Sequence, residues 1–185
     1  MRTLLFAMLS ASMLGCGGGP ATITVASKTL MVKEQNYGMA DYYCDNLARG
    51  EFQVIISDIE VCDLLSADGG NVNAFHKSES SHLRMIFPST LTVVPKVNTF
   101  TVGISDCVGS KGPDTQAIAF FSHSDGTNPT YTVNQPAGSG KINVTDYDKT
   151  ANRLKSDFDL NFPNDHVTGK FDALFCKSIV PGTGK

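Results

Sequence analysis

Histidines with serine or acidic neighbours are the side chains of this sequence best suited to acid–base or metal chemistry. His76 and His82 lie six residues apart, with Glu79 between them. To hold zinc, both imidazoles would have to come within about 2.1 Å of one ion and a third ligand would be needed. No H-E-x-x-H pattern is present. The spacing therefore favours solvated loop histidines over a metal site.

His123 stands between Ser122 and Ser124 and is followed by Asp125, the residue types of a serine hydrolase. Neighbouring residues of a strand point to opposite faces, so these side chains cannot converge on one another. The G-x-S-x-G signature of a nucleophile elbow is also absent. We therefore predict no catalytic residue, and the protein is not expected to be an enzyme.

Oxygen-bearing side chains at alternate positions give one segment a superficial likeness to a calcium loop. They are Asp146, Asp148, Thr150, Asn152 and Asp157. The loop's sharp-turn glycine is replaced by Ala151, and its twelfth residue is aspartate instead of glutamate. A hairpin tip, where Asp and Asn side chains bind the turning backbone, is the favoured interpretation. No metal or cofactor is predicted.

The first nineteen residues, MRTLLFAMLSASMLGCGGG, have the pattern of an export signal. Arg2 precedes an apolar run from Leu4 to Leu14, and small residues follow it. The run is shorter than the 18 or so apolar residues expected of a membrane span. This segment resembles the lipobox of bacterial lipoproteins, with Met13 where leucine is usual. The resemblance implies a signal peptide at residues 1–15 and an acylated Cys16.

By the same resemblance, the mature chain would be tethered to the bacterial cell envelope by its lipid. Gly17, in place of aspartate, favours the outer membrane. Residues 16–21 would form the acylated cysteine and a short tether, followed by one domain at residues 22–185. Ordinary secretion is the alternative interpretation.

Four further cysteines, Cys44, Cys62, Cys107 and Cys176, give an even count with no C-x-x-C spacing. In an exported chain this favours two disulfides, for which three pairings exist. We prefer Cys62 with Cys176 and Cys44 with Cys107. Cys62 closes the first strong strand and Cys176 the last, and such strands are often neighbours in a sheet. Each bridge would contribute about 2–4 kcal/mol.

The charge balance argues against one class of partner. Without residues 1–15, 14 basic residues stand against 18 acidic ones, a net charge of −4. The sequence has no Lys/Arg run and no basic stripe, so nucleic acid is not an expected partner.

Alternating apolar residues predict strands along most of the chain. Expected strands cover residues 22–33 (one strand or two short ones), 51–57, 82–87, 89–94, 99–105 and 117–123. Residues 59–66 read as a turn or short helix around Cys62, and residues 68–71 as a turn. Residues 40–48 are expected to form a short helix or an irregular loop.

The last forty-odd residues have the clearest pattern. Apolar side chains fall on alternate positions of three successive segments joined by short turns, which predicts an antiparallel meander. The segments SGKINVTDYD, LKSDFDLNF and DHVTGKFDALFC resemble the C-terminal meander of poorly characterised bacterial envelope lipoproteins. This resemblance implies a β domain on a lipid anchor and no activity. The fold class expected is all-β, an antiparallel sandwich or partly closed barrel.

The function expected from the sequence is that of a cell-envelope lipoprotein acting as a non-catalytic binding or structural accessory module. Its partners would be the membrane, through the lipid, and an envelope protein or a small apolar ligand. A lipocalin-like carrier of an apolar ligand is the main alternative, and an envelope hydrolase a distant one. A carrier predicts an enclosed cavity of about 300 Å³ or more, whereas an enzyme predicts a cleft where histidine and carboxylate meet.

Overall fold

The computed structural model describes residues 22–44, 47–67, 72–87, 98–103, 115–177 and 179. Eleven strands and two short helices follow one another along them. The elements are β1 (Thr22–Val25), β2 (Lys28–Met31), β3 (Glu34–Cys44), β4 (Leu47–Ser57), α1 (Val61–Ala67), the 3₁₀ helix η1 (Val72–Lys77), β5 (Glu79–Phe87), β6 (Asn98–Gly103), β7 (Gln116–Asp125), β8 (Val133–Pro136), β9 (Ser139–Asp148), β10 (Arg153–Asn161) and β11 (His166–Phe175).

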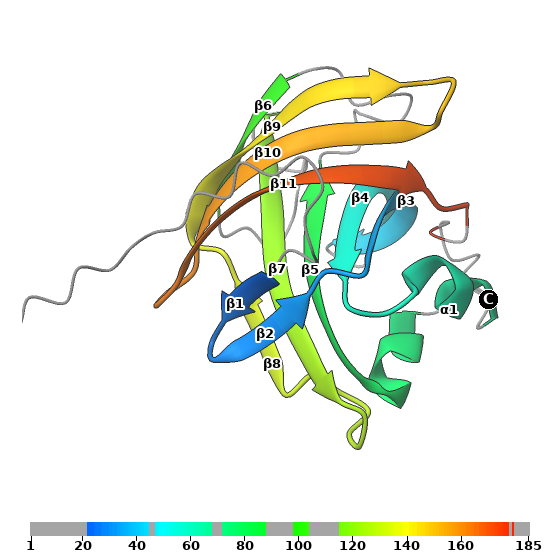
Figure 1. Ribbon diagram of the computed structural model, residues 1–185, viewed down its shortest axis with the longest axis vertical. Helices are drawn as coiled ribbons and strands as arrows, with labels where there is room; N and C mark the ends of the chain where they lie inside the picture. Colours follow the sequence, from blue (N-terminus) through cyan, green and yellow to red (C-terminus); the bar gives the residue numbers. More distant parts are fainter. Residues whose placement is uncertain are drawn as a thin grey trace, which may run out of the picture.

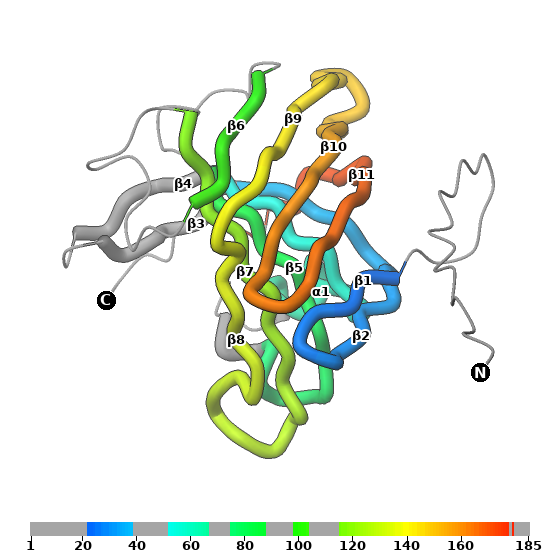
Figure 2. Tube along the Cα trace, turned by 90° about the vertical axis from the view of Figure 1, so that its left-hand side faces the viewer, coloured from blue at the N-terminus to red at the C-terminus, as the bar shows by residue number. Residues whose placement is uncertain are grey.

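Eight of these strands form a closed barrel in the order β5-β4-β3-β11-β10-β9-β6-β7 (Figures 1 and 2). The barrel closes because β5 also pairs with β7, in an antiparallel register that runs from Glu79↔Asp125 to Ile86↔Ile118. β8 is not part of the closed barrel and pairs with β7 in an antiparallel register from Phe120↔Pro136 to His123↔Val133. The all-β prediction is confirmed, and the sheet is closed instead of being a sandwich.

The barrel consists of two antiparallel halves, β3-β4-β5-β7 and β6-β9-β10-β11. Two parallel seams join them. β11 meets β3 at Leu174↔Asn36 and Phe175↔Tyr37, and β6 meets β7 at Thr101↔Gln116 and Val102↔Ala117. In the described chain each seam therefore contains only two residue pairs.

Aromatic rings fill one part of the barrel interior. The rings of Tyr37, Phe52, Phe87 and Phe100 form a series across β3, β4, β5 and β6, with centroids 5.4, 5.5 and 5.0 Å apart. The last contact passes over β7, whose inward residue there, Ala117, is small enough to allow it. The rings of neighbouring strands, and of β5 and β6 across β7, thus contact one another inside the barrel, as close packing of a core requires.

The β1–β2 hairpin forms a separate two-stranded sheet at one end of the barrel (Figure 1). Its apolar residues Ile23, Val25 and Leu30 are buried in the barrel's own core cluster. The turn residues Ala26 and Ser27 both have positive φ, 49° and 62°, as a two-residue hairpin turn that follows the strand twist requires. The Ala26 N–H donates to Asp165 Oδ2 at 3.0 Å, which ties the hairpin to the β10–β11 turn.

A second apolar cluster lies outside the barrel, where α1 contacts β3 and η1 contacts β5 and β7. It includes Ile55, Val61, Leu65, Phe75 and Ile179. The segment after β11 approaches β3 so closely that a Cβ on Gly38 would lie 2.6 Å from the Ile179 Cβ. The second cluster therefore packs the chain's last described residues against the barrel wall.

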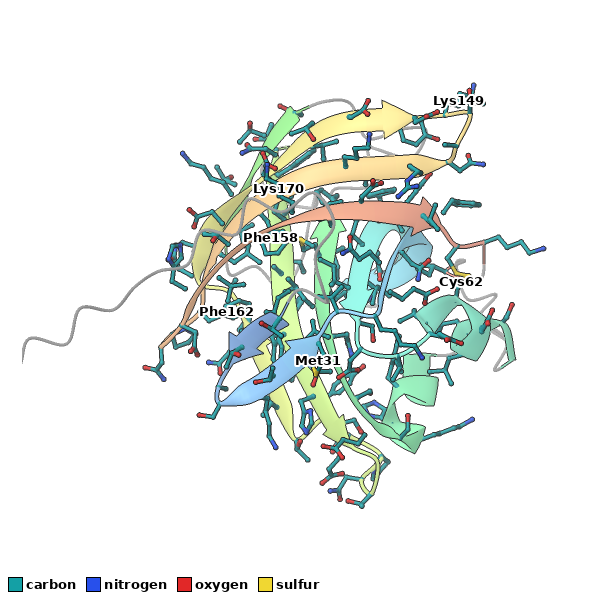
Figure 3. All side chains as sticks on the ribbon, in the orientation of Figure 1. Met31, Cys62, Lys149, Phe158, Phe162 and Lys170 are labelled. Atoms are coloured by element: carbon teal, nitrogen blue, oxygen red, sulfur yellow. A yellow bond between two sulfur atoms is a disulfide. The ribbon has the colours of Figure 1, made fainter. Side chains whose placement is uncertain are left out.

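The sulfur atoms of Cys62 and Cys176 lie 2.16 Å apart, forming a bridge between α1 and the end of β11 (Figure 3). This agrees with the pairing preferred from the sequence. Because 114 residues separate the two cysteines, cross-linking restricts the unfolded chain strongly, by about 4–5 kcal/mol in the loop-entropy model. Cys16 and Cys107 and the side chain of Cys44 lie outside the described residues.

The C-terminal meander is confirmed as β9, β10 and β11, and the short helix around Cys62 as α1. The expectation of a helix or loop at residues 40–48 is wrong, because residues 40–44 and 47–48 belong to the paired strands β3 and β4, whose register runs from Glu34↔Ser57 to Cys44↔Leu47. Pairing with a strong neighbouring strand outweighs the weak local pattern. The strand expected at residues 89–94 and the turn at 68–71 lie outside the described residues.

Neither helix in the described part of the chain has the length and hydrophobicity needed to cross a bilayer.

Gly169 provides a test of interior packing. It lies opposite Phe158 on the inner face of the β10–β11 pair, and a Cβ there would lie 2.5 Å from the Phe158 Cζ. We expect Gly169→Ala to lower the free energy of unfolding by about 1–3 kcal/mol, because the ring has to move within a filled core. Urea denaturation measures it.

Thr168→Ala, at the exposed neighbouring position, is the control and should change stability by no more than about 0.5 kcal/mol. Adding Phe158→Leu to Gly169→Ala should recover part of the loss. A Gly169→Ala variant as stable as the wild type would show that the ring is not held against the strand.

Candidate functional site

A polar layer closes the barrel at the end covered by β1–β2. The inward rows of three strands end here: β4 in Ile56 followed by Asp58, β5 in Leu83 preceded by Ser81, and β7 in Phe121 followed by His123. Because strand side chains alternate, Ser81 and His123 lie on the same face as their apolar neighbours, and Asp58 is the first residue after β4. Ser81 and His123 are opposite each other in the β5–β7 register.

A short hydrogen bond links the two strands in this layer. The Oγ of Ser81 lies 2.9 Å from the Nδ1 of His123, and both side chains are buried. No other hydrogen bond to the His123 ring is present among the described residues. The Nε2 is therefore left with capacity for a further partner.

Asp58 turns the chain after β4 and binds the start of β5. The Ser81 backbone N–H donates to both oxygens of its carboxylate, at 2.9 and 3.0 Å. Partial burial raises the pKa of the Asp58 carboxyl above its ordinary value, whereas the Ser81 N–H and the nearby His123 act in the opposite direction. A half-buried carboxylate thus lies beside the Ser81–His123 pair.

These groups line an open pocket of about 570 Å³ between the hairpin and the barrel end. One wall consists of Thr29, Met31, Val32 and Lys33. Opposite it are Asp58, Ile59, Glu79, Ser81 and His123. Met31 is on the rim, with 56 % of its surface exposed, and Figure 3 shows it on β2. We call this the mouth pocket.

The mouth pocket has the volume of a small-molecule site, and mouths of barrels are common places for such sites. Its serine, histidine and aspartate are not arranged as in a serine hydrolase. In that arrangement serine bonds to Nε2 and aspartate to Nδ1. Here serine occupies Nδ1, and the aspartate binds the serine backbone.

Sequence reasoning considered His123 but did not connect it with Ser81 and Asp58, because the three residues come from distant parts of the chain. The neighbours of His123 that were considered with it make other contacts: Ser122 Oγ donates to Asn134 Oδ1 at 2.9 Å, and Asp125 accepts from the Thr127 backbone N–H at 2.9 Å. The pairing of His123 with Ser81 follows from the β5–β7 register, which no local sequence pattern indicates.

The suggested calcium segment forms a hairpin tip. The Asp148 carboxylate accepts the backbone N–H groups of Thr150 and Ala151, both at 2.9 Å, and Asn152 has a positive φ of 50°. Asp146 and Asp157 instead pair with Lys155 and Lys170 on the outer face. In the described part of the chain, no three His, Cys, Asp or Glu side chains are arranged to hold a metal ion.

The expectation of solvated loop histidines is wrong for His82, which is on β5 and only 2 % exposed. Its ring lies 4.7 Å from that of Phe75 and 5.2 Å from that of Tyr131. Tyr131 also contacts His76, in η1, at 4.2 Å. The Nδ1 atoms of both histidines are buried without a hydrogen-bond partner in the described structure. We call Phe75, His76, His82 and Tyr131 the outer aromatic cluster.

Burial, with Arg84 and His76 nearby, lowers the pKa of His82 to about 3. The folded protein therefore holds a neutral imidazole, whereas the unfolded chain takes up a proton below about pH 6.5. The contribution of His82 to stability is complete above that pH and is lost as pH falls towards 3.

We expect His82→Phe, which keeps an aromatic ring in the cluster, to remove this loss. Between pH 6 and 4, the free energy of unfolding of the wild type should fall by about 1.4 kcal/mol per pH unit more than that of the variant. Urea denaturation across this range measures the difference.

His166→Gln is the control, because it removes an exposed histidine whose partner among the described residues is Asp159; it should not reproduce the change in slope expected of His82→Phe. Equal slopes for the wild type and His82→Phe would mean that His82 takes up its proton in the folded protein.

Neither a protein-family model, nor a curated protein, nor a solved structure matches this chain.

Proposed function

We propose that this protein is a cell-envelope lipoprotein whose barrel is a non-catalytic binding module, with its ligand in the mouth pocket. The observation that carries the proposal is the pocket itself: about 570 Å³, open to solvent, with a buried histidine and a half-buried carboxylate in its wall. Buried polar groups with spare hydrogen-bonding capacity are costly unless they serve a partner.

The sequence places the proposed anchor close to this pocket. Cys16 is six residues before Thr22, where β1 begins, and a fully extended chain of six residues spans about 20 Å. A lipid on Cys16 would thus hold the hairpin, and the pocket beside it, within that distance of the bilayer surface. Several acyl chains would make such anchoring stable.

A carrier that encloses an apolar ligand inside the barrel is less well supported. The ring series from Tyr37 to Phe100 occupies the interior, and Phe158 covers Gly169. Tyr131 lies outside the barrel, against His76 and His82. The proposed ligand therefore binds at the mouth instead of in the core.

The anchor is tested by metabolic labelling with palmitate. We expect the wild-type chain to incorporate label and Cys16→Ser to lose it, because the thiol is the acceptor implied by the lipobox resemblance. Cys44→Ser, which removes another cysteine, should label like the wild type. Unchanged labelling of Cys16→Ser would remove the anchor from the proposal.

Binding at the mouth is tested by native mass spectrometry of the full chain, purified from its bacterial envelope in mild detergent. The wild type should carry a non-covalent mass beyond the acyl anchor. Thr29→Trp should lose it, since Thr29 is an exposed residue of the pocket wall and an indole there obstructs the opening.

Thr168→Trp makes the same substitution at an exposed position on β11 and should retain the extra mass. If the ligand survives in Thr29→Trp, it is held somewhere other than the mouth pocket.

A further inference from the structure

Two carboxylates, Asp58 and Glu79, and one lysine, Lys33, line the mouth pocket. Asp58 has no Lys or Arg nitrogen within ion-pair distance among the described residues, and the Ser81 N–H is the donor to its carboxylate. Lys33 lines the same pocket, but its Nζ is 3.0 Å from the Glu60 carboxylate and thus already paired. Glu79 adds another exposed carboxylate to the lining. Among the described residues, the Asp58 carboxylate therefore has no lysine or arginine partner, and the two carboxylates in the pocket lining favour a positively charged ligand.

A second observation points to the same ligand chemistry. His123 is only 5 % exposed and lines the pocket, and no described group bonds to its Nε2. When Nδ1 donates its proton to the Ser81 oxygen 2.9 Å away, Nε2 presents a lone pair. The pocket then offers two kinds of acceptor, a carboxylate and an imidazole nitrogen, to one ligand with several N–H donors.

The remaining wall is apolar. Met31, Val32 and Ile59 line it, and the Met31 side chain is exposed at the rim. A thioether and two branched side chains suit a short hydrocarbon segment, and methionine adapts its shape to different ligands. The ligand should therefore combine a charged end with an apolar body.

We infer that the mouth pocket takes a primary ammonium group carried on a short apolar chain. The ammonium binds between the Asp58 carboxylate and the His123 Nε2, and the apolar chain lies against Met31, Val32 and Ile59. This inference rests on the proposed binding function and names its ligand class. Both a soluble amine and the amine headgroup of a lipid have this chemistry.

The experiment uses the full chain in detergent micelles and follows the imidazole Cε1–H resonance of His123 by NMR. The probes are n-butylammonium, butan-1-ol and butanoate, which share a four-carbon body and differ in charge. Butylammonium should shift the His123 signal with at least about tenfold higher affinity than the alcohol or the anion, as a charge-assisted hydrogen bond supplies. The signal of exposed His166 should not move.

Asp58→Asn tests the carboxylate without removing the turn, because the amide oxygen can still accept the Ser81 N–H. It should lower the affinity for butylammonium by at least about tenfold. Asp146→Asn removes an exposed carboxylate paired with Lys155 on the outer face and should leave the affinity unchanged. Equal binding of Asp58→Asn and wild type would overturn the inference.

Other outcomes separate this inference from the proposed function. Preferential binding of butanoate or butan-1-ol at His123 would overturn the ammonium ligand and leave a binding pocket in place. If no probe shifts His123 and the native mass spectra of Thr29→Trp and wild type are identical, both ideas fail.

The source of the amine is distinguished with the full chain in nanodiscs. If a lipid headgroup is the ligand, replacing phosphatidylcholine by phosphatidylethanolamine should weaken butylammonium binding severalfold by competition. Equal butylammonium affinity in the two bilayers supports a soluble amine.

Discussion

Closure of the sheet by the β5–β7 pairing is the constraint on which the rest of this structure depends. Without it, β5 and β7 would be edges with unpaired backbone groups. The pairing also turns one face of every strand inward, so that a single alternation of side chains supplies the core. Near the Glu79↔Asp125 end, the β5–β7 pairing sets Ser81 opposite His123. The same register therefore closes the barrel and forms the polar layer at its mouth.

The inner and outer faces of the barrel wall are packed in different ways. Inside, large rings are accommodated by small partners, as Ala117 beneath Phe87 and Phe100 illustrates. Outside, α1 and η1 cover part of the wall, and Phe75 of η1 packs with Tyr131 against His82. The Cys62–Cys176 bridge holds α1 to the end of the last strand. The sequence pattern of β5 serves both faces, which explains why few of its residues are exposed.

Strict alternation in the last three strands made the meander predictable, because neighbours in sequence are also neighbours in the sheet. The same logic places Cys62 near Cys176 once the first strong strand and the last are taken as close. It fails where partners are distant in sequence: nothing local to Ser81 indicates a contact with His123. Nor does the segment around His82 reveal that Tyr131, about fifty residues later, will cover it. Site residues were therefore harder to predict than strands.

The two parallel seams divide the barrel into halves that are paired more extensively within themselves than with each other. Within each half the strands are joined by long antiparallel ladders, whereas each seam has two residue pairs in the described chain. Local openings of a protein begin where the fewest backbone bonds must break. Fluctuations of this barrel should accordingly separate one four-stranded half from the other, with the halves moving as units. The Cys62–Cys176 bridge lies beside the β11–β3 seam and restrains it. Separation of the halves should therefore occur at the β6–β7 seam, with the β11–β3 seam acting as the hinge.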